Sequence, residues 1–147
     1  MPERELADLV DGTEVVDVRL QRFEGEMFRT PPDGISVSLD WVEPRYSLED
    51  GAILALYENV IRYTGADPED ETKTAPVATV TVRHIVELSL DEGDVPSADA
   101  VSQLLRGTVL FLVYPYVRAA LHRLPAEFGL PGFLLPYLRR NVSAPGD

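Results

Sequence analysis

The feature that most limits how this chain can fold is a nearly continuous apolar stretch in its last third. Residues 98–123 have a helix-forming pattern, and the middle of this stretch is apolar on almost every side of a helix. Such a helix must be covered on all sides, which one layer of a 147-residue chain does not provide. We therefore predict a helix over residues 98–123, kinked at Pro115, that is sandwiched between subunits of an oligomer. The residues predicted to make its assembly contacts are Leu105, Val109, Leu112, Tyr114 and Tyr116.

Four segments before this helix have the composition of strands. Residues 16–28, with Gly25 as a candidate bulge, and residues 35–41 alternate apolar and polar side chains. Residues 52–63 begin with apolar side chains on both faces, which is typical of a strand covered on both sides. Residues 77–90 are rich in Val, Thr and Ile, and a short helix is expected over residues 3–10. The order predicts an α+β fold in which a four-stranded antiparallel sheet carries a long helix on one face.

The negative charge of the chain is concentrated in the predicted strands. The sequence has 13 basic and 25 acidic residues, for a net charge of −12. Residues 94–147 have five arginines and four acidic residues, so about −13 lies on residues 1–93. This balance argues against a nucleic-acid partner, because phosphates require a basic surface. The length predicts one domain over residues 1–140, followed by a flexible polar tail over residues 141–147.

Other features of the sequence indicate a soluble, cytoplasmic protein. There is no cysteine, and the charged N-terminal residues are not followed by an apolar signal core. The longest apolar run, residues 109–117, has nine residues, whereas a membrane-spanning helix needs about 20. We therefore expect no insertion into a membrane.

Signatures of catalysis and of metal binding are weak. The two histidines, His84 and His122, lack the spacing of a metal site, and there is no glycine-rich phosphate loop. A small α+β enzyme, of the hotdog or cystatin-like kind, would need a polar constellation in a pocket. Only His84 with Glu58 or Glu87 offers one. We therefore expect no enzyme activity, no catalytic residue, no cofactor and no metal.

The C-terminal segment combines apolar side chains with helix-breaking residues. Phe128, Phe133, Leu134, Leu135 and Tyr137 alternate with glycine and proline. Apolar side chains in such a segment either fill the core or line a binding groove. Composition alone favours filling of the core.

Several short motifs resemble those of the SecB family of protein-export chaperones. Residues 114–118, Tyr-Pro-Tyr-Val-Arg, resemble the Phe-Pro-Tyr-Ala-Arg of the family's main helix. Residues 129–131 correspond to the glycine-bearing turn that follows, and residues 133–136 to a proline-containing apolar stretch. Residues 28–31, Phe-Arg-Thr-Pro, resemble a Phe-Glu-Ala-Pro at the end of the family's first strand. The resemblance covers residues 14–138 and identifies a divergent SecB-like member.

The resemblance implies a fold, an assembly and a function. SecB-like proteins have a four-stranded sheet and a long helix, and they assemble as a dimer of dimers with the helices between the sheets. They bind non-native polypeptides in apolar grooves without ATP. The export form passes clients to the SecA motor through an acidic sheet face, and another branch protects the antitoxin of a toxin–antitoxin pair. Arg29 stands where the family has a glutamate, but Glu24 and Glu26 are near enough to form the docking face.

Our leading interpretation is an ATP-independent holdase that acts in protein export or protects a specific client. Its partners would be unfolded or partly folded polypeptides, with SecA or an antitoxin as further candidates. The alternatives are a dedicated antitoxin chaperone or adaptor, and the small enzyme described above. The candidate client-binding residues are Trp41, Phe128, Phe133, Leu134, Leu135 and Tyr137.

Overall fold

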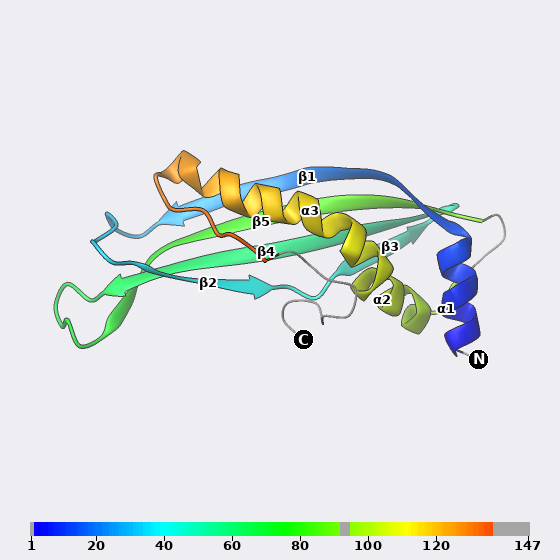
Figure 1. Cartoon of the computed structure of the whole chain (residues 1–147), viewed down its shortest axis with the longest axis horizontal. Helices are drawn as coiled ribbons and strands as arrows, with labels where there is room; N and C mark the ends of the chain where they lie inside the picture. The colour runs from blue at the N-terminus through cyan, green and yellow to red at the C-terminus, as the bar shows by residue number, and fades with distance from the viewer. Residues whose placement is uncertain (1, 92–94, 137–147) are drawn as a thin grey trace.

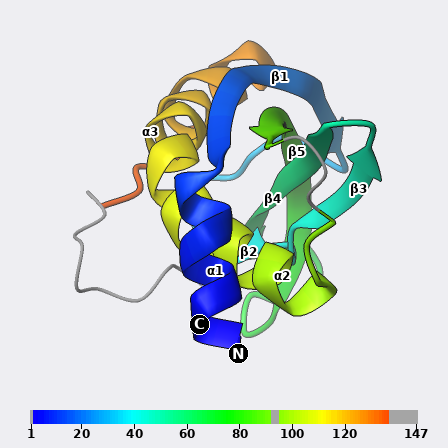
Figure 2. The ribbon, with the colours of Figure 1, turned by 90° about the vertical axis from the view of Figure 1, so that its right-hand side faces the viewer.

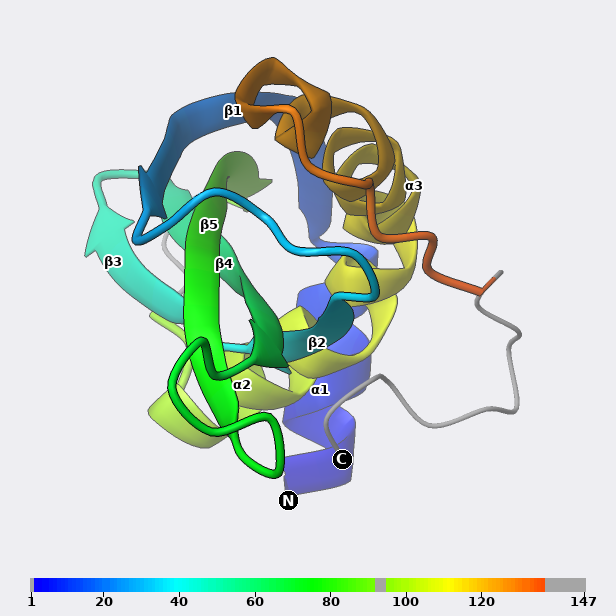
Figure 3. The same ribbon diagram turned by 90° about the vertical axis from the view of Figure 1, so that its left-hand side faces the viewer.

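The computed structural model describes residues 2–91 and 95–136 and has the α+β architecture predicted above. Within these residues, five antiparallel strands form one twisted sheet that curves around the longest helix (Figures 1, 2 and 3). The elements are α1 (Pro2–Asp11), β1 (Thr13–Met27), β2 (Ser36–Trp41), β3 (Arg45–Glu49), β4 (Ala52–Ala66), β5 (Thr74–Leu90), α2 (Ala98–Arg106), α3 (Thr108–Arg123) and the 3-10 helix η1 (Leu124–Phe128).

The sheet has one strand more than the four predicted. Its order is β1-β5-β4-β2, and β3 also pairs with β4. β2 pairs with the second half of β4 and β3 with the first half, so together they form one interrupted edge. The interruption includes Pro44, which has no N–H to donate to β4. The segment of β3 was not predicted as a strand, because it has only five residues between Pro44 and the turn at Asp50 and Gly51.

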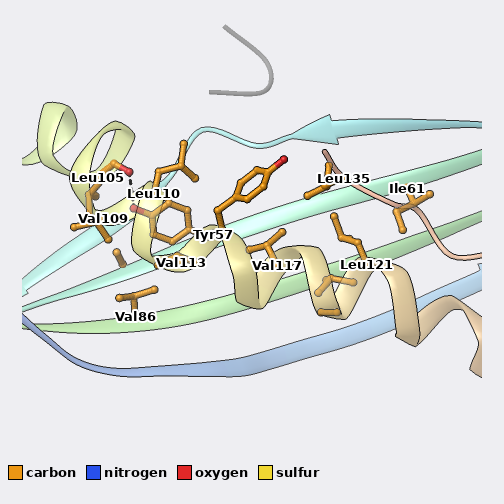
Figure 4. Packing of buried hydrophobic residues seen from close by; sticks show 14 of the residues in the cluster. Tyr57, Ile61, Val86, Leu105, Val109, Leu110, Val113, Val117, Leu121 and Leu135 are labelled. Atoms are coloured by element: carbon orange, nitrogen blue, oxygen red, sulfur yellow. Dashed lines mark hydrogen bonds between the residues drawn. The ribbon is translucent and has the colours of Figure 1, made fainter. Parts of the chain in front are cut away.

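One face of the sheet carries the core. Side chains alternate across a strand, so the odd-numbered residues of β4 and the even-numbered residues of β5 from Ala78 to Leu88 point to the same side and are buried. Figure 4 shows Tyr57, Ile61 and Val86 facing the inner side of α3. The Tyr57 hydroxyl donates a hydrogen bond of 2.6 Å to the carbonyl oxygen of Leu105, which fixes the end of α2 to the sheet.

The predicted single helix over residues 98–123 is two helices, and its break is not where we expected it. α2 and α3 meet at Gly107 at an angle of 43° between their axes. Gly107 has φ −108° and ψ −100°, which is outside the helical region. Pro115 remains inside α3. Pro115 and Phe111 are both exposed, so the carbonyl group that loses its hydrogen bond at the proline lies on the solvent side.

The N-terminal part of α2 is held by two capping contacts. Ser97 is the N-cap residue and its Oγ accepts a hydrogen bond of 3.2 Å from the Ala100 N–H. The Ser97 N–H donates to Glu5 Oε1 of α1 at 2.7 Å, which ties α1 to α2. Within the described residues no single helix has the length and hydropathy of a membrane span. Taken together as a bent pair, α2 and α3 have the length and hydropathy of such a span, by length and composition only.

The opposite face of the sheet is not covered by any described element of this chain. Leu54, Leu56 and Val60 of β4 point to this open face and are partly exposed. The prediction that β4 is covered on both sides is therefore wrong within one chain. Ion pairs cross the open face, and the least exposed of them joins Arg83 to Glu58, whose side chains are 19% and 18% exposed.

The Glu58–Arg83 pair is expected to stabilise the sheet measurably. Arg83 Nε and Nη2 both donate to Glu58 Oε1, at 2.9 and 2.7 Å. The variant Glu58→Gln should lower the free energy of unfolding in urea by about 1.5 kcal/mol, because a shielded, charge-assisted pair is lost. The matched control is Asp40→Asn, which breaks the Arg62–Asp40 pair at 2.6 Å, where both side chains are 54% exposed. The control should show no measurable loss. Equal losses in the two variants would contradict this reasoning.

Candidate functional site

The outer side of α3 carries large apolar side chains that this chain does not bury. Phe111, Leu112 and Tyr116 are 42%, 49% and 53% exposed, and we call them the outer row of α3. Val109 and Tyr114 point the other way and are buried, as is Leu105 on α2. Of the five predicted assembly residues, three therefore pack inside their own chain, and only Leu112 and Tyr116 are available to another molecule.

An aromatic stack joins the edge of the sheet to α3. Trp41 is the last residue of β2 and is half-buried. Its ring is parallel to that of Tyr114, with 6.0 Å between the ring centroids. The stack closes the space between β2 and α3 at this point. Trp41, a candidate client-binding residue, thus lies at the edge of the helix layer with part of its surface in solvent.

Phe128, another candidate, packs onto β1. Its ring lies 5.4 Å from that of Phe23, at an interplanar angle of 57°. Gly25 provides the space, since a Cβ atom there would lie 2.5 Å from the Phe128 ring. Gly25 is paired in register with Val80 and is not the bulge we expected. The irregularities of β1 are between Val15 and Asp17 and between residues 20 and 22.

Residues 130–136, which we call the strap, follow η1 back along α3 in an extended conformation (Figure 1). Leu135 is 2% exposed and points into the core, as Figure 4 shows, while Leu134 is 61% exposed and Phe133 is half-buried. Tyr137 lies outside the described residues. The predicted client-binding residues therefore do not share one environment: some are exposed, some are buried in the core, and some are half-buried.

Side-chain donors hold the strap by its main-chain carbonyl groups. The Tyr63 hydroxyl donates to the Pro131 carbonyl oxygen and the Tyr114 hydroxyl to that of Pro136, both at 2.6 Å. Arg118 Nε donates to the Leu135 carbonyl oxygen at 2.7 Å. Burial raises the pKa of Tyr63 to about 12 and also raises that of Tyr114, so both hydroxyls keep the proton that they donate. Neither Tyr63 nor Arg118 was predicted as a site residue, although Arg118 belongs to the family motif.

The predicted docking residues lie on the open face. Glu24 and Glu26 of β1 are exposed and line a shallow depression of about 250 Å³ together with Thr79 and Thr81 of β5. Glu24 is paired with Arg22 at 2.6 Å, which reduces the local negative charge. Arg29 lies at the end of this strand, where Nε and Nη2 donate at 3.4 Å to the carbonyl groups of residues 76 and 75.

The structure does not bring together the three residues that were considered for an enzyme site. His84 is 4% exposed and points to the helix-covered face, and burial lowers its pKa to about 4. Glu58 and Glu87 point to the open face, on the other side of the sheet. Within residues 2–91 and 95–136, no three His, Cys, Asp or Glu residues are close enough to hold a metal ion. The histidine is thus separated from both carboxylates that were considered for it.

The fold and the surface together define a class of protein: an α+β chain with a helix-covered sheet that leaves large apolar side chains in solvent. No family model matches the chain. The chain is 26% identical to the SecB-like chaperone Rv1957 of Mycobacterium tuberculosis strain H37Rv. The match covers 92% of this chain and 83% of the relative. The SecB-like chaperone MT2006 of strain CDC 1551 matches with the same identity and coverage. The solved structure of Rv1957 in complex with a ChAD peptide from the HigA1 antitoxin has the same fold, with a TM-score of 0.75 and 22% identity over 95% of this chain and 99% of that one. The chain is thus similar to SecB-like chaperones, which supports the resemblance that its motifs predicted.

Proposed function

We propose that this protein is an ATP-independent molecular chaperone that holds non-native polypeptides in apolar grooves. The observation that carries the proposal is the apolar surface that the chain leaves in solvent at the edge of its helix layer, around Trp41 and the strap. Leu134 is 61% exposed there, and Trp41 and Phe133 are half-buried. Removal of apolar surface from water stabilises a complex by about 25 cal/mol per Å², whatever the exact sequence of the client. The named chaperones among the relatives support the same proposal.

The unburied residues have two proposed roles. The outer row of α3 forms contacts between subunits, in a homotetramer that is a dimer of dimers, and covers the helix that we predicted to be sandwiched. The boundary between β2 and α3 binds clients, through Trp41 and the candidates around the strap. The net charge of −12 keeps these surfaces soluble and favours positively charged client segments. The protein acts in the cytoplasm, and Glu24 and Glu26 on the open face provide a docking surface for a partner such as SecA.

Suppression of aggregation tests the proposal. The purified protein should prevent the aggregation of a chemically denatured model client on dilution, without nucleotide and at no more than an equimolar ratio of chains. Light scattering measures the result, and serum albumin at the same concentration is the control. Scattering that is not reduced at a several-fold excess would count decisively against a holdase.

A dedicated antitoxin chaperone is the second candidate. The observation in its favour is that the structural neighbour Rv1957 was solved with a peptide from the HigA1 antitoxin. Such a chaperone would bind one peptide tightly and bind generic clients weakly. Affinities measured for several unrelated unfolded proteins separate the two candidates, because a general holdase binds them all with similar strength.

A further inference from the structure

The strap is held in a manner that does not depend on its own sequence. Tyr63, Tyr114 and Arg118 all donate to main-chain carbonyl oxygens, which every residue type provides. The donors come from β4 and α3, which are fixed in the core, and the acceptors all lie in the extended strap. The arrangement is a row of rigid donors facing an extended segment.

The side chains of the strap add an apolar pattern to this backbone recognition. Leu130 and Leu135 are buried at 3% and 2% exposure, and Phe133 is half-buried between them. The strap belongs to no sheet or helix, and the Phe133 N–H donates to the Leu121 carbonyl oxygen at 2.9 Å. An extended polypeptide with large apolar residues at the same spacing, and with glycine at the position of Gly132, would make equivalent contacts.

We propose that the strap occupies the client site of its own chain, and that an extended apolar segment of a client replaces it there. This inference rests on the proposed chaperone function and adds the binding mode. The client would accept hydrogen bonds from Tyr63, Tyr114 and Arg118 through its main chain. Its apolar side chains would fill the positions of Leu130, Phe133 and Leu135. Recognition of main-chain atoms and apolar volume restricts the client to segments with this apolar spacing and a glycine at the position of Gly132.

Gly132 offers a way to remove the strap without deleting it. A Cβ atom at Gly132 would lie 2.0 Å from the carbonyl oxygen of His122 and 2.8 Å from its carbonyl carbon. Both are main-chain atoms of α3, so they cannot move aside as a flexible side chain would. The variant Gly132→Ala should therefore lift the strap away from α3 and leave the site open.

The test uses a fluorescein-labelled peptide with the sequence of residues 129–136, flanked by lysines for solubility. Fluorescence anisotropy should show that Gly132→Ala binds this peptide roughly tenfold more tightly than the unmodified chain, because the strap no longer competes. Adding Tyr63→Phe to that variant should weaken binding roughly fivefold, since one donor to the peptide is lost. Gly51→Ala is the matched control. Gly51 has φ +73° in the turn between β3 and β4, so the substitution strains the chain without touching the strap, and affinity should not change.

The outcomes separate this inference from the proposed function. If Gly132→Ala still unfolds cooperatively but binds the peptide no more tightly than the unmodified chain, the strap does not occupy the client site. If Gly132→Ala binds the peptide more tightly but the added Tyr63→Phe does not weaken this binding, Tyr63 does not donate a hydrogen bond to the bound peptide. If Gly132→Ala does not fold, Phe133→Ala provides the same test without a clash, with a smaller gain in affinity. If the unmodified protein suppresses aggregation while neither strap variant gains affinity, the holdase stands and only the strap proposal fails.

Discussion

The variant Leu112→Asp is expected to have a smaller mass in solution than the unmodified protein. Leu112 lies in the outer row of α3, next to Phe111 and near Tyr116, and is 49% exposed within its own chain. If this row forms the subunit contact, the aspartate places a charge in an apolar interface, at a cost of several kcal/mol for each copy. The proposed dimer of dimers should then dissociate into dimers or monomers. Light scattering coupled to gel filtration measures this change directly.

Val95→Asp is the control for this measurement. Val95 is 87% exposed and lies before α2, away from the outer row, so its replacement adds the same charge without touching α3. Its mass should equal that of the unmodified protein. A monomeric mass for the unmodified protein, or an unchanged mass for Leu112→Asp, would contradict assembly through α3. Circular dichroism of both variants shows whether the fold itself is retained.

Much of the fold could be predicted because its strands have simple periodicities. The alternating side chains of β2 and the apolar, β-branched residues of β4 and β5 predicted these strands correctly. The helix predicted over residues 3–10 is α1, which ends one residue later, at Asp11. β3 was missed because five residues after a proline provide too short a pattern to separate from a turn. We expected the helix to break at Pro115, because proline has no N–H and its ring clashes with the preceding turn. The structure instead bends at Gly107, where the backbone is not helical and a Cβ atom would lie 3.1 Å from the Gln103 carbonyl oxygen. Pro115 stays inside α3, since the carbonyl group that it leaves without a hydrogen bond lies on the solvent side.

The candidate site was harder to predict, because its residues have no periodicity. The sequence shows Leu134 and Leu135 as equivalent neighbours, but one is 61% exposed and the other 2%. Which of them points inward depends on the donors of β4 and α3 that fix the strap, and these are distant in sequence. The division between buried and exposed residues on α3 follows from helix geometry. The sequence does not reveal which side is buried, because almost every position of this helix is apolar.

The core of this sheet contains polar groups that affect its stability. Asn59 is fully buried on β4, directly opposite Trp41 on β2, and His84 lies opposite the next inward residue, Tyr57. Neither amide atom of Asn59, nor Trp41 Nε1, nor His84 Nδ1 has a hydrogen-bond partner among the described residues. Buried polar groups without partners cost free energy, and the cost rises when such a group must carry a charge. His84 can take up a proton, so its cost depends on pH.

His84 is expected to make the protein lose stability in mildly acidic solution. Burial lowers its pKa from 6.5 to about 4, so between these pH values the unfolded chain binds a proton that the folded chain does not. The free energy of unfolding must then fall as the pH falls, and level off above pH 7. The expected loss from this group is about 2 kcal/mol between pH 7 and pH 5. Urea denaturation at a series of pH values measures it.

The two histidines of the chain provide a matched pair for this measurement. The variant His84→Gln should lose most of the decline between pH 7 and pH 5, because no ionisable group is left at that position. His122→Gln should keep the full decline, since His122 is exposed near the end of α3. Carboxylates contribute mainly below pH 5 and affect all three proteins alike, which is why the comparison stops there. The same pH dependence in His84→Gln as in the unmodified protein would show that His84 is not enclosed as the structure has it.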